Sequence, residues 1–223
     1  MKKLLFLIPI LSLGLLFNSC KKEVEGAKAK VEEAKEAAAA TMSAKSFNID
    51  VANSSVTWTG SKVVGDNHQG KLKLTNGNLS VKDGNIEAGT FTIDINSLMV
   101  TDLEAGKGKE KLEGHLKSAD FFDSEKFPTA SFTVSNVSKV TGTPGVTHNI
   151  TGNLKMKGVT KSVTFGANVN VGGSKLSAVT PQFKINRNDW GMVYGNSTIA
   201  GLAKDRVISD DIALIINLNA SAN

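Results

Sequence analysis

Residues 163–171 read VTFGANVNV, in which apolar side chains alternate without interruption with polar or small ones. Successive side chains of a β-strand point to opposite faces of a sheet, so this run predicts a long strand with one buried and one solvated face. Shorter runs with the same period of two occur at residues 91–95, 131–135 and 214–219. From about Phe47 onward the chain is therefore predicted to be all-β.

Turn signals separate these runs. They are Asn76-Gly77, Asp83-Gly84, Pro144-Gly145 and Gly172-Gly173. Dipeptides of this kind favour tight turns between antiparallel strands. The charged segment Gly106–Ala119 departs from the pattern, because Leu112 and Leu116 are spaced four residues apart, as on one face of a short helix. Many strands with one helical insert indicate an antiparallel barrel or a sandwich, and periodicity alone does not choose between them.

The N-terminus has the layout of an export signal. Two lysines precede an apolar run, Leu4–Phe17, which is shorter than the roughly 20 residues of a membrane span. The run leads into Asn18-Ser19-Cys20, which resembles a bacterial lipobox. Residues 1–19 are therefore predicted to be a lipoprotein signal peptide and Cys20 to be lipid-modified. The protein would then be anchored in the cell envelope, on the periplasmic face or the outer-membrane surface. An ordinary signal peptide with an incidental cysteine is the alternative.

The remaining chain divides into two compositions. Residues 20–45 are rich in alanine, glutamate and lysine, which predicts a partly helical, solvated tether. Residues 46–223 are enough for one domain with a substantial core. Because the chain has a single cysteine, this domain must be stable without an internal disulfide.

The formal net charge is +5, and two of the positive charges belong to the signal segment. Lysine and arginine form no stripe interleaved with aromatic residues, so nucleic acid is not an expected partner. The three histidines, His68, His115 and His148, have no zinc-site spacing, and no nucleophile motif of the G-x-S-x-G kind is present. The sequence therefore predicts no metal, no cofactor and no enzymatic activity, although a spatial triad could still form.

Several longer motifs point to one family. The most specific is HLKSADFFD at residues 115–123, followed by Phe127-Pro128; the others are WTGSK at 58–62, GVTK at 158–161 and FKINRNDWG at 183–191. Together they resemble the YceI-like family, bacterial polyisoprenoid-binding proteins with a lipocalin-like barrel, from about Phe47 to the end. The resemblance implies an eight-stranded antiparallel barrel with a short helical insert. It also implies an elongated apolar pocket for an isoprenoid chain, such as a quinone tail or a polyprenyl lipid.

Candidate ligand-binding residues follow from the inward positions of the predicted strands. They are Phe91, Ile93, Phe132, Val134, Phe165, Val169, Phe183 and Ile185, with His68 at the mouth. Ordinary core packing is the alternative for each of the eight apolar residues. Phe121, Phe122 and Phe127 follow the predicted helix, where they could form a lid or fix the helix to the barrel.

Three functional classes remain open at this stage. The first is an envelope lipoprotein that holds a long apolar ligand for storage, transport or stress protection. The second is a structural or stress-response protein with a solid barrel, and the third is an enzyme acting on a bound lipid. An open apolar cavity would favour the first class, and an interior filled by side chains the second. The third would need polar groups with shifted pKa values that converge inside the cavity.

Overall fold

The computed structural model describes residues 24–222, so the predicted signal peptide and Cys20 lie outside the described residues. The strands are β1 (Ala27–Lys28), β2 (Lys30–Glu33), β3 (Lys45–Ile49), β4 (Ser55–Ser61), β5 (Asn67–Lys82), β6 (Asn85–Val100), β7 (Thr129–Lys139), β8 (His148–Met156), β9 (Val159–Gly172), β10 (Lys175–Val179), β11 (Phe183–Asn186) and β12 (Asp211–Ala222). The helix α1 spans Lys109–Lys117, and a short 3₁₀ helix spans Arg187–Trp190. The predicted all-β class and the short helical insert are both confirmed.

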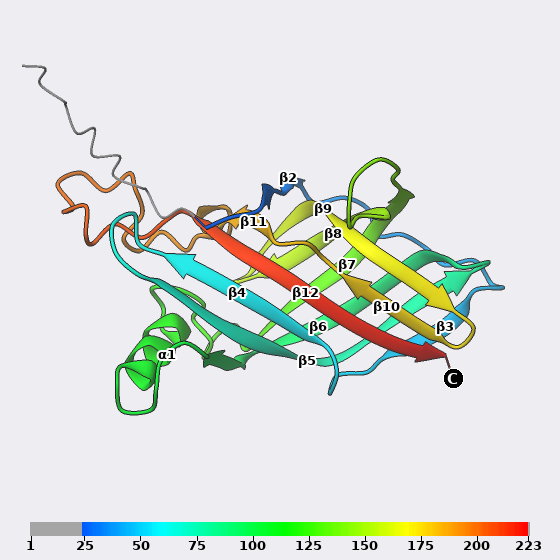
Figure 1. Ribbon diagram of the computed structural model, residues 1–223, viewed down its shortest axis with the longest axis horizontal. Helices are drawn as coiled ribbons and strands as arrows, with labels where there is room; N and C mark the ends of the chain where they lie inside the picture. Colours follow the sequence, from blue (N-terminus) through cyan, green and yellow to red (C-terminus); the bar gives the residue numbers. More distant parts are fainter. Residues whose placement is uncertain (1–23, 223) are drawn as a thin grey trace, which may run out of the picture.

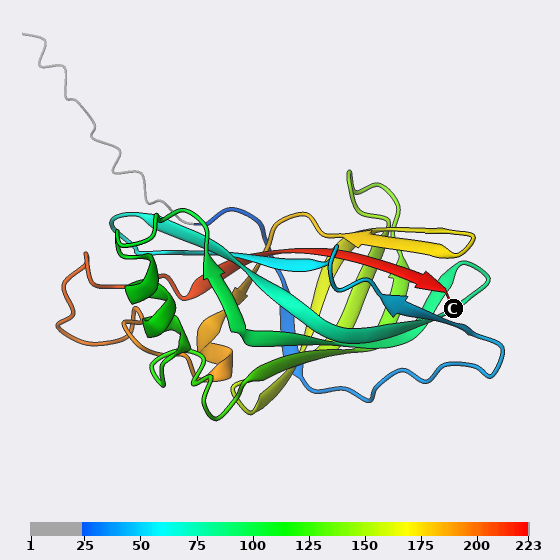
Figure 2. The same cartoon turned by 90° about the horizontal axis from the view of Figure 1, so that it is seen from below.

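The long strands close into a ring. Antiparallel pairing runs from β4 through β5, β6, β7, β8, β9 and β10 to β12, and β12 pairs back with β4. β3 occupies the same place in the ring as β4 at a different level, because it also pairs with β5 on one side and with β12 on the other. β11 likewise pairs with β12 beyond the end of β10. Figures 1 and 2 show an elongated molecule in which α1, the β4–β5 turn and residues 191–210 gather at one end, and the C-terminus lies near the other.

The N-terminal segment completes the wall of this ring. β1 pairs in parallel with β11, and β2 pairs antiparallel with β9 in the region that β10 does not reach. Val24 and Ala29 are buried, so residues well before Ser46 pack against the ring. The helical tether predicted for residues 20–45 is therefore wrong over the described part. Helix propensity is worth a few tenths of a kcal/mol per residue, whereas unpaired strand edges leave whole rows of backbone groups without partners.

One half of the ring is packed solid. Four phenylalanine rings cross its interior in sequence: Phe91 lies 5.3 Å from Phe132, Phe132 lies 5.6 Å from Phe165, and Phe165 stacks on Phe183 at 4.6 Å between centroids. We call these four rings the phenylalanine row. Beyond it, toward the C-terminal end of β12, buried side chains such as Leu176 fill the interior.

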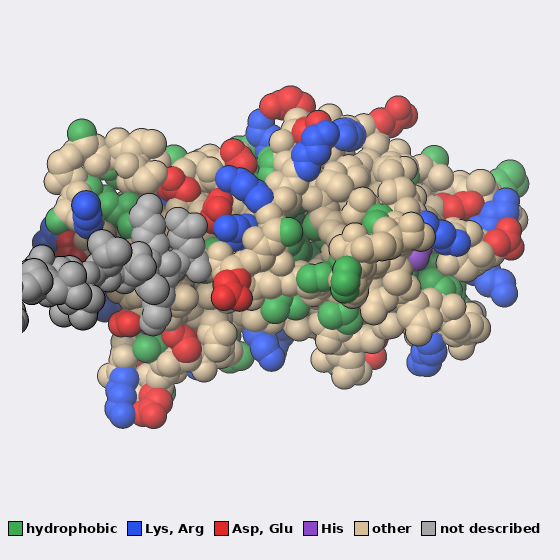
Figure 3. Space-filling view, turned by 45° about the horizontal axis from the view of Figure 1, so that its top comes forward, with side chains coloured by type: hydrophobic (Ala, Val, Ile, Leu, Met, Phe, Trp, Pro, Cys, Tyr) green, Lys and Arg blue, Asp and Glu red, His purple; other side chains and the backbone are tan. Residues whose placement is uncertain are grey.

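The outer surface carries charges of both signs. On the face shown in Figure 3, acidic and basic side chains are interspersed. None of the helices within residues 24–222 is long and apolar enough to cross a membrane.

Packing of the phenylalanine row gives a stability prediction. A Cβ at Gly152 would lie in steric conflict with the Phe132 ring and 2.7 Å from the Thr133 carbonyl oxygen. Gly152→Ala should therefore lower the free energy of unfolding by about 1–3 kcal/mol, as overpacking does. A Cβ at Gly172, at the end of β9, meets no atom within 4 Å. Urea unfolding of Gly172→Ala, the matched control, should differ from wild type by less than about 0.5 kcal/mol. Equal destabilisation by both variants would contradict this packing.

Candidate ligand-binding cavity

A cavity of about 800 Å³ occupies the other half of the ring and opens at the end where α1 lies. Its inner wall is apolar. The wall residues come from β4, β5, β6, β7, β8, β11 and β12 and include Val56, Trp58, Leu72, Ile93, Ile95, Leu98, Ala130, Leu154, Ile185, Ile212 and Leu214. The volume falls within the range of about 300–1,000 Å³ that is typical of small-molecule sites.

The phenylalanine row lies just beyond the closed end of this cavity. Phe91, Phe132 and Phe183 do not line it, but on each strand the residue two positions away does: Ile93, Ala130 and Ile185. Side chains two residues apart on a strand share a face and are separated by about 6.6 Å. The cavity therefore ends where the row begins.

Two segments outside the ring cover the open end. The first is α1 with the residues that follow it, which contribute Leu112, Leu116, Phe121 and Phe122. The second is the irregular segment 191–210, called the mouth loop from here on, which contributes Met192, Tyr194, Ile199, Leu202 and Ile208. Because most of these side chains are apolar, the cavity suits an apolar ligand from its closed end almost to its rim.

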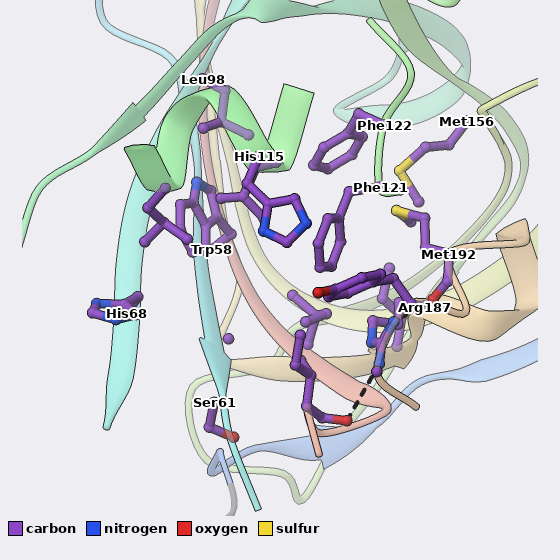
Figure 4. A pocket seen from close by; sticks show the side chains of 18 of the residues that line it. Trp58, Ser61, His68, Leu98, His115, Phe121, Phe122, Met156, Arg187 and Met192 are labelled. Carbon is purple, nitrogen blue, oxygen red and sulfur yellow. Dashed lines mark hydrogen bonds between the residues drawn. The ribbon is translucent and has the colours of Figure 1, made fainter. Parts of the chain in front are cut away.

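The two covering segments meet in an aromatic cluster. The His115 ring makes edge contacts with Phe121 at 5.0 Å and with Tyr194 at 4.8 Å. His115 Nε2 also lies 3.0 Å from the carboxylate of Asp120. In Figure 4 His115 and Phe121 lie side by side over the cavity. The cluster therefore joins the two covering segments to each other beside the cavity.

Arg187 is hydrogen-bonded to both ends of the mouth loop. Its side chain is 1% exposed and donates hydrogen bonds to the backbone carbonyls of Met192, Ile208 and Ser209. Its Nη2 atom also lies 3.8 Å from Asp210, so its charged neighbour is this residue rather than the adjacent Asp189. Burial lowers the pKa of Arg187, and the charge of Asp210 partly offsets this effect. These three hydrogen bonds connect Arg187, which also lines the cavity, to both ends of the mouth loop, so the side chain helps to hold the loop in place.

Asp210 contributes to the same anchor. Burial works to raise its pKa, but hydrogen bonds from Ser197 and Asn188 and the charge of Arg187 outweigh burial and hold the pKa below its ordinary value. A lowered carboxylate pKa means that folding favours the ionised form. The stability it contributes is present above the unfolded-state pKa and is lost as pH falls through the folded-state value.

His68 lies at the edge of the cavity. Its Nδ1 atom is 2.8 Å from Asp102, which also accepts a hydrogen bond from the Gln69 N–H at 3.0 Å. Burial works to raise the pKa of Asp102, whereas these two hydrogen bonds lower it, and the net pKa is below the ordinary value. Figure 4 shows His68 set apart from the aromatic cluster. Within residues 24–222 no group of three or more His, Cys, Asp or Glu side chains could hold a metal ion.

The structure separates the nine predicted ligand-binding residues into two groups. Ile93, Ile185 and His68 line the cavity. The other six lie outside its lining: Phe91, Phe132, Phe165 and Phe183 form the phenylalanine row, and Val134 and Val169 pack in or against the core.

The sequence did not identify several lining residues. Trp58 lines the cavity, and its buried Nε1 has no hydrogen-bond partner among the described residues. Ser61 Oγ is also buried and has no hydrogen-bond partner among the described residues. Tyr194 and the rest of the mouth loop have no periodicity that could have revealed them. The spacing of Leu112 and Leu116 predicted the helix but not the surface that it covers.

Comparison with known proteins now places the chain. A family model described as "YceI-like domain" matches residues 47–220. The chain belongs to the YceI-like family. A "UPF0312 protein" of Pseudomonas putida is 34% identical over 128 residues, 55% of this chain and 62% of that protein. "Protein YceI" of Salmonella arizonae is 37% identical over 98 residues, 44% of this chain and 47% of that protein. The chain thus spans less than two thirds of the length of these relatives.

Solved structures support the fold assignment. The crystal structure of Burkholderia cenocepacia BcnA aligns with a TM-score of 0.59 at 19% identity and covers 78% of this chain and 99% of its own. A polyisoprenoid-binding domain from Saccharophagus degradans, implicated in plant cell wall breakdown, aligns with a TM-score of 0.55 at 16% identity, covering 79% and 98% respectively. At these identities the likeness concerns the fold.

The role of Arg187 leads to a second prediction. Arg187→Met should leave three carbonyl groups without their donor, each at a cost of about 1–3 kcal/mol of unfolding free energy where water does not replace it. Hydrogen exchange across residues 193–208 should become faster than in wild type. The matched control is Arg206→Met, because Arg206 is an exposed residue of the same loop. Unchanged exchange in Arg187→Met would show that the loop is held by other contacts.

Proposed function

We propose that this chain is an envelope lipoprotein that binds a long apolar ligand, such as an isoprenoid, a quinone or a related lipid, inside an eight-stranded lipocalin-like barrel. Binding would serve storage, transport or stress protection. The observation that carries the proposal is the apolar cavity of about 800 Å³ with one open end. The open cavity also disfavours a purely structural role with a solid interior. Its polyisoprenoid-binding structural neighbour is consistent with this ligand class.

Burial of an apolar chain supplies enough free energy without polar recognition. Each buried methylene contributes about 0.8 kcal/mol, and measured noncovalent affinities reach a ceiling near 20 kcal/mol. A chain that is only partly enclosed can therefore bind tightly after ordering costs are subtracted.

The phenylalanine row limits how much of the ligand is enclosed. The nine-residue run at 163–171 is long enough, at about 3.3 Å per residue, to line a deep channel, but Phe165 at its third position belongs to the row. The ligand would occupy the half of the interior between the row and the mouth. Any further length, or a polar headgroup, would lie at the rim near the mouth loop.

Filling the cavity tests this proposal. Ala130 lines the cavity, whereas Ala167 does not and packs in the core of the other half. Ala130→Phe should fold with near wild-type stability and lose most binding of an added quinone or polyprenol, measured by native mass spectrometry. Ala167→Phe should instead be destabilised by about 1–3 kcal/mol, because no space receives the ring.

Two results would contradict the proposal. One is undiminished ligand uptake by correctly folded Ala130→Phe. The other is a clean ligand-free mass for wild-type protein, both when it is purified from its host envelope and after incubation with isoprenoids. Either result would move the site away from the cavity or remove it.

Anchoring is tested separately at Cys20, which lies outside the described residues. Acyl groups of more than one chain make membrane association effectively persistent. The wild-type protein should incorporate an alkyne-tagged fatty acid and fractionate with membranes, whereas Cys20→Ser should do neither. Membrane retention of Cys20→Ser without fatty-acid label would show that the protein is held by something other than an acyl anchor.

A further inference from the structure

The end of the molecule that bears the cavity mouth also receives the N-terminal segment. Val24, the first described residue, is buried and borders a surface hollow that it shares with Ser61, Lys62 and Ser197. Ser61 and Lys62 also line the cavity, so the chain enters the fold beside the mouth. Cys20 is four residues earlier in the sequence. Four residues span at most about 14 Å, so an acyl group on Cys20 would hold the mouth close to the bilayer.

The same end presents exposed apolar side chains. Val64 in the β4–β5 turn is 52% exposed, and in the mouth loop Val193, Tyr194 and Ile199 are 52%, 45% and 46% exposed. Three of them, all in the mouth loop, also line the cavity, so the exposed apolar surface is continuous with its apolar interior. We call these four residues the apolar rim. A grouped set of exposed apolar side chains marks a surface for an apolar partner more often than scattered ones do.

Basic side chains lie beside the apolar rim. Lys28, Lys62 and Lys184 line the hollow next to Val24. Lys28 and Lys184 share one carboxylate, that of Asp211, at 3.5 and 3.6 Å. Asp210, the second carboxylate of the hollow, lies near the buried Arg187. The hollow therefore has a surplus of positive charge, which attracts an anionic lipid surface.

We propose that the apolar rim docks onto the surface of an anionic phospholipid bilayer, so that the cavity opens directly toward the lipid. This proposal rests on the proposed function, because it assumes the acyl anchor and a ligand that comes from the membrane. The rim side chains contact the interface, and the three lysines lie at headgroup level. The ligand then moves between bilayer and cavity without crossing water, which would otherwise oppose the transfer of each of its methylenes.

The test compares probes at the two ends of the lipidated protein. The thiol of Cys20 is consumed by lipidation, so one introduced cysteine is the unique labelling site. Ile199→Cys places an environment-sensitive fluorophore on the apolar rim. Met42→Cys is the matched control, because Met42 is an equally apolar, fully exposed residue next to Thr41, which bonds to Glu87 of β6. Both variants are reconstituted into phosphatidylglycerol–phosphatidylcholine vesicles that carry a lipid-bound quencher.

Docking predicts a blue-shifted emission at residue 199 and severalfold stronger quenching there than at residue 42. Raising the salt concentration should reduce this difference when phosphatidylglycerol is present. Equal quenching at both sites would overturn the proposal, because the molecule would then lie with its long side on the bilayer. The proposal would also be overturned if both probes remained in water.

Mass spectrometry of unlabelled wild-type protein, reconstituted in parallel because Ile199 lines the cavity, separates this proposal from the proposed function. A bound lipid in protein whose residue 199 probe stays in water would refute docking and leave ligand binding intact. Quenching of the residue 199 probe, when the protein takes up no isoprenoid, would support docking and contradict the proposed function. Circular dichroism of each labelled variant confirms that it is folded.

Discussion

Stacking among four phenylalanine rings sets the division of this molecule into a packed half and a hollow half. Phe91, Phe132, Phe165 and Phe183 come from four different strands, and their centroids are 4.6 to 5.6 Å apart from one ring to the next. Aromatic contacts of this kind add about 0.5–1.5 kcal/mol each beyond area burial. The row therefore stabilises the ring of strands and closes the cavity at the same place.

The strands around the row explain why a cavity can exist without collapse. Each wall is held by backbone pairing around a closed ring, so the side chains near the mouth need not fill the interior to keep the strands together. Where β10 ends, the N-terminal strands β1 and β2 take up pairing with β11 and β9. The protein thus uses a segment that precedes its family domain to complete the wall beside the mouth.

Local patterns in the sequence were sufficient to predict much of the fold. The alternation at 163–171 became β9, and the leucine spacing within 106–119 became α1. Both depend on a residue's near neighbours, which a sequence displays directly. The N-terminal strands were missed because their pairing partners lie more than a hundred residues away, and only the assembled ring reveals the unpaired edges that recruit them.

The site was predictable only in part for a related reason. Inward-facing positions could be recognised from the sequence. Whether an inward side chain lines the cavity or packs against an aromatic ring depends on how far along its strand it lies between the mouth and the packed half. The side chains of Ile93 and Phe91, two residues apart on β6, point to the same face of the strand. Ile93 lines the cavity, whereas Phe91 belongs to the phenylalanine row. The residues of the mouth loop follow no period at all, and their position is set by Arg187 and Asp210.

The most direct test of the account is a crystal structure of the domain purified from its own host with bound lipid retained. The account predicts continuous density for an apolar chain that begins at the mouth and stops at the phenylalanine row, with its polar end near the mouth loop. Density that passes the row into the packed half, or a ligand bound only on the outer surface, would contradict it.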